Sequence, residues 1–165
     1  MATATLVLGY GNTLRRDDGA GVEVARQLAA LALADVEIVE AHQLLPEHAE
    51  LLARADRAIF ADASVDADLP GVALEQLDPP DPGAEIRLDP HLSNPGGLLA
   101  LAAHLFGRAP EAWIVRLPVA ELGIGEGLSP TTSTAVNEAV HLIRDFCQPD
   151  PDRAGLPAGP RQGEP

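Results

Sequence analysis

Short apolar runs alternate with helix-like segments along this chain, and this alternation restricts its possible folds more than any other feature. The strand-like runs are residues 6–10, 36–41, 58–62, 72–77 and 112–119. The segments with apolar residues at helical spacing are residues 17–32, 46–55, 95–106 and 130–147. Parallel strands need helical crossovers, and right-handed crossovers place helices on both faces of the sheet. We therefore predict an α/β fold: a three-layer α/β/α sandwich with a mainly parallel sheet of about five strands.

Local signals mark several helix boundaries. Ser129 and Pro130 combine a capping hydroxyl with a proline at the first helical position, which is typical of a helix start. Gly107 directly follows the third helical pattern and is typical of a helix end. We expect the first helix to begin near Asp17 and Asp18.

The length and the composition of the C-terminal end predict the domain organisation. A chain of 165 residues is long enough to bury one hydrophobic core, so we expect residues 1–147 to form a single α/β domain. From residue 148 the sequence is rich in proline and glycine and has few apolar residues to offset the entropy of ordering. Residues 148–165 are therefore predicted to be a disordered tail. We expect a monomer.

The charge balance excludes some classes of partner. The formal net charge is −14, from 25 acidic and 11 basic residues. Nucleic acid and anionic membrane surfaces are polyanions, so we expect neither as a partner. The same acidity favours a cationic substrate segment or a divalent metal, although acidity alone also keeps a protein in solution.

Sequence features that would place the protein outside the cytoplasm are missing. No segment reaches the roughly 18 uninterrupted apolar residues that span a bilayer, and no basic stretch followed by a long apolar run is found near Met1. Cys147 is the only cysteine, so an internal disulfide framework is excluded. We expect a cytoplasmic protein.

A glycine turn follows the first predicted strand. Gly9 and Gly11 after a strand invite comparison with a dinucleotide-binding loop, but Leu14 occupies the position of the third glycine. Asp17 and Asp18 then place carboxylates where a pyrophosphate would need bare backbone amides. We reject nucleotide binding and expect the glycines to allow a tight bend and a close approach to a neighbour.

Polar residues that follow the predicted strands are the main candidates for a site, because ligands bind at the carboxyl ends of parallel strands. Asp17 and Asp18 follow the first strand, Asp62 ends the third, and His91 precedes the helix at Pro95. Two carboxylates and one imidazole suit nickel or zinc, whereas calcium requires more oxygen ligands. Each residue also has a structural interpretation, because aspartates often cap helices and stabilise turns.

Serine and cysteine peptidase mechanisms find little support. No G-x-S-x-G motif is present, and Cys147 lies on the apolar face of the last predicted helix, which favours a structural thiol. The remaining histidines lack clustered carboxylates and are interpreted as surface or packing residues: His42, His48, His104 and His141.

The segment from Gly9 to Gly21, Gly-Tyr-Gly-Asn-Thr-Leu-Arg-Arg-Asp-Asp-Gly-Ala-Gly, closely resembles the signature that opens the hydrogenase maturation endopeptidases. The resemblance continues through four further stretches. These are Ala61-Asp62-Ala63, His91 with Pro95, Leu98-Leu99-Ala100-Leu101, and Glu126-Gly127-Leu128-Ser129-Pro130. The resemblance covers nearly everything except the tail.

This resemblance implies an α/β/α endopeptidase that removes the C-terminal extension of the nickel-iron hydrogenase large-subunit precursor after nickel insertion. Carried over one at a time, the metal-binding and catalytic positions of the family fall on Asp18, Asp62 and His91. At the first of these, some family members carry glutamate. The implied metal is nickel carried by the precursor, and other divalent ions could occupy the same site.

Two neighbouring residues are assigned to substrate binding, each with an alternative. Asn12 either hydrogen-bonds a substrate backbone or stabilises the turn. Asp17 is grouped with Asn12, with helix capping or orientation of Asp18 as its alternatives.

Two other functions stay open at this point. One is an accessory protein that binds nickel or the hydrogenase precursor without cutting it. The other is a metal-independent enzyme in which Asp18 and Asp62 act on a small molecule as a paired acid and base.

Overall fold

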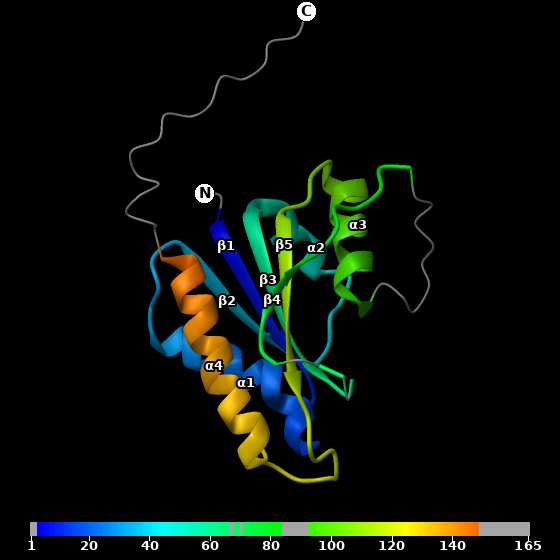
Figure 1. Ribbon diagram of the computed structural model, residues 1–165. Helices are drawn as coiled ribbons and strands as arrows, with labels where there is room; N and C mark the ends of the chain where they lie inside the picture. The colour runs from blue at the N-terminus through cyan, green and yellow to red at the C-terminus, as the bar shows by residue number, and fades with distance from the viewer. Residues whose placement is uncertain (1–2, 67, 70, 84–92, 149–165) are drawn as a thin grey trace, which may run out of the picture.

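The computed structural model describes residues 3–66, 68–69, 71–83 and 93–148, and its centre is a five-stranded sheet (Figure 1). In spatial order the strands are β2 (Val36–Ala41), β1 (Thr3–Tyr10), β3 (Ala55–Ser64), β5 (Glu111–Pro118) and β4 (Leu74–Gln76). Three neighbouring pairs are parallel, and only β4 runs antiparallel to its neighbour β5. The prediction of a mainly parallel sheet of about five strands is confirmed.

Helices cover both faces of the sheet. The helices α1 (Ala20–Ala30) and α4 (Pro130–Cys147) lie together on one face, and α2 (His48–Arg54) and α3 (Pro95–Phe106) cover the other (Figure 1). The predicted three-layer α/β/α sandwich is thus confirmed. Within the described ranges, no helix has the length and apolar character needed to cross a membrane.

The alternation of side chains along β1 explains the two halves of the core. Leu6 and Leu8 are fully buried against α2 and α3, whereas Val7 between them is buried against α1 and α4. In β3, Phe60 and Ile59 divide between the two layers in the same way. Because both faces are covered, the middle of each strand is a continuous apolar run, at residues 6–8 and 58–61, as the sequence pattern indicated.

The start of α1 differs from the prediction. A short 3-10 helix, η1 (Arg16–Gly19), occupies the expected start, and α1 begins only at Ala20 without a side-chain cap. Arg16 adopts a left-handed backbone conformation with φ of 47°, which interrupts regular helix. Asp17 therefore does not cap α1, and its carboxylate is used elsewhere.

The other predicted boundaries agree with the structure. The Ser129 hydroxyl accepts a hydrogen bond from the Thr132 amide at 3.3 Å and caps α4, with Pro130 in the first turn. Gly107 ends α3 in a left-handed conformation with φ of 75°. The predicted tail lies outside the described residues except for Gln148, which follows the last residue of α4.

Two glycines bring α1 into direct backbone contact with the sheet. A Cβ atom on Gly9 would lie 2.1 Å from the Gly21 carbonyl oxygen, and one on Gly21 would lie 2.2 Å from the Ala61 carbonyl oxygen. Neither position has room for a side chain, so the contact requires glycine. The close approach holds the segment before α1 over the carboxyl ends of β1 and β3.

Candidate active site

The parallel strands β1 and β3 end side by side, and each contributes one polar residue to the same edge. Tyr10 is the last residue of β1, and Asp62 lies near the end of β3. Asp18 reaches this edge from η1, which follows β1 after a tight turn. The strand-end argument therefore brings Asp18 and Asp62 to one place, as predicted.

The Asp62 carboxylate is held by a buried phenol. The Tyr10 hydroxyl donates a hydrogen bond of 3.1 Å to Asp62 Oδ2, and Tyr10 is buried. Burial is the main cause that raises the pKa of Asp62 to about 6. The bond from Tyr10 opposes this increase, and the negative charge of Asp18 adds to it. The two carboxylates thus interact electrostatically.

Tyr10 remains a hydrogen-bond donor across the physiological range. Burial, followed by the charge of Asp62, raises the pKa of the Tyr10 hydroxyl far above its ordinary value. The hydroxyl therefore keeps its proton, and the negative charge of the pair resides on Asp62. Tyr10 was not among the predicted site residues, because its partner lies 52 residues away in the sequence.

The glycine turn fixes Asp18. The Asn12 amide donates a hydrogen bond of 3.0 Å to Asp18 Oδ2, and Gly11 packs so closely that a Cβ atom would lie 1.9 Å from the Asp18 carbonyl oxygen. The Asn12 side-chain oxygen accepts a bond of 3.0 Å from the Leu14 amide. This oxygen stabilises the turn, which is one of the two predicted roles, and contact between Asn12 and substrate stays a prediction.

Asp17 points away from this edge and into the protein. Its side chain is fully buried and accepts four hydrogen bonds, from the amides of Ala120, Glu121 and Ser129 and from the Ser129 hydroxyl, at 2.7 to 2.8 Å. Burial opposes ionisation, but these bonds prevail and lower the pKa of Asp17 to about 2. The assignment of Asp17 to substrate binding is therefore wrong, because its carboxylate is saturated and sealed from solvent.

The third predicted ligand, His91, lies outside the described residues. Within the part of the chain that the structure describes, no three histidine, cysteine, aspartate or glutamate side chains gather as a metal site. The two carboxylates present fit a divalent cation, because the charge of Asp18 makes the ionised form of Asp62 less favourable and a nearby cation would relieve that repulsion. Among the described residues, the hydrogen bond from the Asn12 amide goes to Asp18 Oδ2, and none of these residues donates to Asp18 Oδ1.

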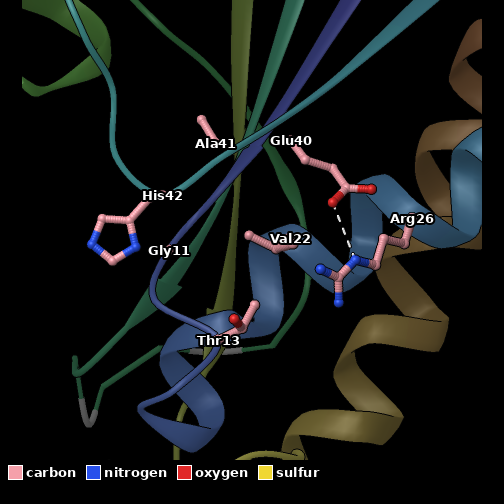
Figure 2. A pocket seen from close by; sticks show the side chains of 7 residues that line it. All are labelled: Gly11, Thr13, Val22, Arg26, Glu40, Ala41 and His42. Carbon is pink, nitrogen blue, oxygen red and sulfur yellow. Dashed lines mark hydrogen bonds and ion pairs between the residues drawn. The ribbon is translucent and has the colours of Figure 1, made fainter.

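A cavity of about 230 Å³ adjoins the turn (Figure 2). Its lining residues are Gly11, Thr13, Val22, Arg26, Glu40, Ala41 and His42. Figure 2 shows the His42 imidazole and the Arg26 guanidinium on either side of Gly11, and the Arg26 Nε atom pairs with Glu40 Oε2 at 3.1 Å. The cavity thus begins one residue from the amide that holds Asp18.

His42 was interpreted from the sequence as a surface or packing residue, and the structure adds that it lines this cavity. It directly follows β2, so the strand-end rule that selected Asp62 would also have found His42. His48 has a structural role, since its Nδ1 atom accepts a bond of 3.0 Å from the Leu45 amide before α2. Cys147 is half-buried beside the core, and burial raises the pKa of its thiol, which does not suit a nucleophile.

Fold and site together define a class: an α/β/α protein with paired carboxylates at the carboxyl edge of a parallel sheet and a cavity beside them. No family model matches the sequence, and no match is found among curated proteins. Solved structures do match.

The similar structures agree with the family that the glycine-rich signature resembles. The NiFe hydrogenase maturation protease HybD from Thermococcus kodakarensis is 24% identical, with a TM-score of 0.67 over 88% of this chain and 99% of that one. The hydrogenase maturating endopeptidase HybD from E. coli is 22% identical, with a TM-score of 0.67 over 92% and 94%. An endopeptidase from Escherichia coli is 25% identical, with a TM-score of 0.61 over 85% and 89%. The chain thus has the fold of the hydrogenase maturation proteases.

Proposed function

We propose that this protein is an endopeptidase that removes the C-terminal extension of a nickel-iron hydrogenase large-subunit precursor after nickel insertion. The observation that carries the proposal is the pairing of Asp18 and Asp62 at the carboxyl edge of the sheet. The same two residues lie at metal-binding positions of the resembling signature. Solved structures of this fold that are named as hydrogenase maturation proteases support the same function.

Recognition of the precursor would rest on its nickel. Asp18 and Asp62 offer carboxylate oxygens on separate, rigid elements, which suits contact with a divalent ion already held by the substrate. His91 is the proposed third contact. Other divalent ions could occupy the same oxygens in the isolated protein.

The peptide around the scissile bond would run along the adjoining cavity. His42 and Thr13 there present groups that can hydrogen-bond a peptide backbone, and Gly11 allows close approach because it has no side chain. In this arrangement the nickel fixes one point of the substrate and the cavity orients the chain that follows.

Asp62 is suited to proton transfer. In the isolated protein, a pKa of about 6 leaves most of its carboxylate ionised at neutral pH. An ion held by the precursor would lower this pKa, so the carboxylate oxygen that does not contact the ion would take the proton from water. Water oxygen would then attack the scissile carbonyl carbon as its proton passes to Asp62. Collapse of the tetrahedral adduct breaks the C–N bond, and the proton on Asp62 goes to the departing amine. The Tyr10 hydroxyl positions this carboxylate, and the charge of Asp18 contributes to its raised pKa.

The intact mass of a purified, nickel-loaded large-subunit precursor tests the proposal. We expect the wild type to remove the C-terminal extension and Asp62→Asn to lose this activity. Asp56→Asn is the matched control, because Asp56 lies near the amino end of the same strand, away from Asp62, and its side chain is 64% exposed. If the wild type binds the precursor and leaves its mass unchanged, the protein is an accessory factor and the endopeptidase proposal is wrong.

A further inference from the structure

The segment that carries Asp18 is tied to a loop from the other end of the chain. The Arg16 amide donates to the Gly125 carbonyl oxygen at 2.9 Å, and the Gly125 amide donates to the Leu14 carbonyl oxygen at 2.9 Å. The Asp17 amide also donates to the Glu121 carbonyl oxygen at 3.0 Å. Residues 14–17 and the loop 119–128 are therefore joined by backbone contacts.

The buried Asp17 side chain completes this connection. Its four hydrogen bonds all come from residues 120–129, and the Ser129 hydroxyl that bonds it also lies 3.1 Å from Thr132 Oγ1. The Thr132 hydroxyl donates to the Pro118 carbonyl oxygen at 2.8 Å. One carboxylate thus links η1 to the end of β5 and to the start of α4.

Apolar burial does not hold the middle of this loop. Ile124 is 94% exposed, and Gly125 has a φ of 147° with the Arg16 guanidinium packed against it. The polar contacts with residues 14–17 are the ones that place the loop. By the same contacts, the loop places residues 14–17.

The backbone of η1 needs such support. Arg16 has a left-handed conformation, which is unfavourable for residues other than glycine and persists only where neighbouring contacts enforce it. This conformation directs the two consecutive carboxylates differently. Asp17 is fully buried, and Asp18 lies half-buried where it accepts the bond from the Asn12 amide.

We propose that Asp17 is a positioning residue for Asp18: its buried carboxylate locks η1 to the 119–129 segment and thereby holds Asp18 in place. The consequence for cleavage rests on the proposed function. The positioning itself does not, because it is a property of the isolated protein.

Amide NMR spectra of the full-length protein test the positioning directly. The reporter is the Asn12 amide, which donates to Asp18 Oδ2. In Asp17→Asn, one carboxylate oxygen becomes an amide that faces donors, so we expect the Asn12 signal to shift and its hydrogen-exchange protection to fall at least tenfold. Ile143→Val is the control. Ile143 is fully buried in α4, so this substitution lowers the stability of the fold without changing a partner of Asp17.

Two further variants keep the test decisive if Asp17→Asn does not fold. Ser129→Ala removes one hydrogen bond to Asp17 together with the cap of α4, and Ser129→Thr restores a hydroxyl that can make both contacts. We expect the alanine variant to weaken protection of the Asn12 amide and the threonine variant to restore it. An Asn12 amide that stays unchanged while the amides of Ala120 and Glu121 shift would overturn the proposal.

Cleavage of the nickel-loaded precursor gives the second measurement. We expect Asp17→Asn to lower kcat/KM at least tenfold at a temperature where it is fully folded, and Ile143→Val to retain wild-type activity. Wild-type cleavage with an unaffected Asp17→Asn variant would overturn the positioning role and leave the proposed function intact. A wild type that does not cleave would overturn the proposed function, and the NMR result would still decide the role of Asp17.

Discussion

Tyr10 ends β1 and Asp62 lies near the end of the neighbouring parallel strand β3, and the Tyr10 hydroxyl donates a hydrogen bond of 3.1 Å to Asp62 Oδ2. This bond stabilises the ionised carboxylate and partly offsets the effect of burial on its pKa. A phenol that stays protonated thus limits the increase in the pKa of this buried acid, so that its carboxylate is ionised at neutral pH. The pair gives the first of four predictions.

Tyr10→Phe should raise the pKa of Asp62 above its value of about 6, because the hydrogen bond that favours the charged form is lost. The carboxyl carbon of Asp62, followed by NMR as a function of pH in the isolated protein, measures this directly. The acid limb of precursor cleavage should move to higher pH by the same amount. A midpoint that is unchanged or lower would show that Tyr10 does not stabilise the ionised carboxylate.

Asp62→Asn should stabilise the fold at alkaline pH. The folded-state pKa of Asp62 is about 6 against an ordinary value of 3.8, so the folded state binds this proton more tightly than the unfolded state. Stability therefore falls as pH rises through this window, and the loss is complete above pH 6. The asparagine variant avoids this loss, which amounts to at most about 3 kcal/mol. Urea unfolding at pH 8 should favour the variant, and the advantage should vanish near pH 4.

Asp17 should produce the opposite pH dependence in a lower window. Its folded-state pKa of about 2 lies below the ordinary 3.8, so its contribution is complete above pH 4 and is lost as pH falls toward 2. Asp17→Asn should cost about 2 kcal/mol at neutral pH and flatten the acid limb of the stability curve. Unfolding measured between pH 2 and 5 checks this. A variant that keeps the wild-type acid limb would assign that limb to other carboxylates.

Gly21→Ala should be strongly destabilising, because its Cβ atom would lie 2.2 Å from the Ala61 carbonyl oxygen and 2.6 Å from that of Tyr10. We expect a loss of about 2 to 4 kcal/mol from forcing α1 off the sheet. Gly96→Ala in the first turn of α3 is the matched control, since its nearest contact is 3.5 Å away. It should be neutral or stabilising by about 0.5 to 1 kcal/mol. Equal effects of the two substitutions on urea unfolding would contradict close packing at Gly21.

The strands and their alternation with helices along the chain were accessible from the sequence because their signals are local, whereas the order of the strands in the sheet was not predicted. The apolar alternation around Val7 and Ile59 reports burial on both faces of a sheet, and the capping pattern of Ser129 and Pro130 marks the start of α4. Placement of Asp18 and Asp62 at one edge followed from the parallel sheet alone. These features require no knowledge of distant contacts.

What the sequence did not predict depends on contacts between distant residues. Asp17 and Asp18 are identical neighbours, and their separate roles are set by residues 120–129 and by the Asn12 amide. The delayed start of α1 has the same origin, because the left-handed Arg16 is held by Gly125. Tyr10 was missed because no local pattern connects it to Asp62.

The hydrogen bond between Asp17 and the Ser129 amide joins residues that are 112 positions apart. During synthesis on the ribosome, β1, β2 and β3 are complete by Ser64, long before Ser129 emerges. The chain can therefore assemble the middle of its sheet while the segment bearing Asp18 still lacks its anchor. We expect the edge that carries Asp18 and Asp62 to form last, so that a nascent chain completes it only once α4 is made.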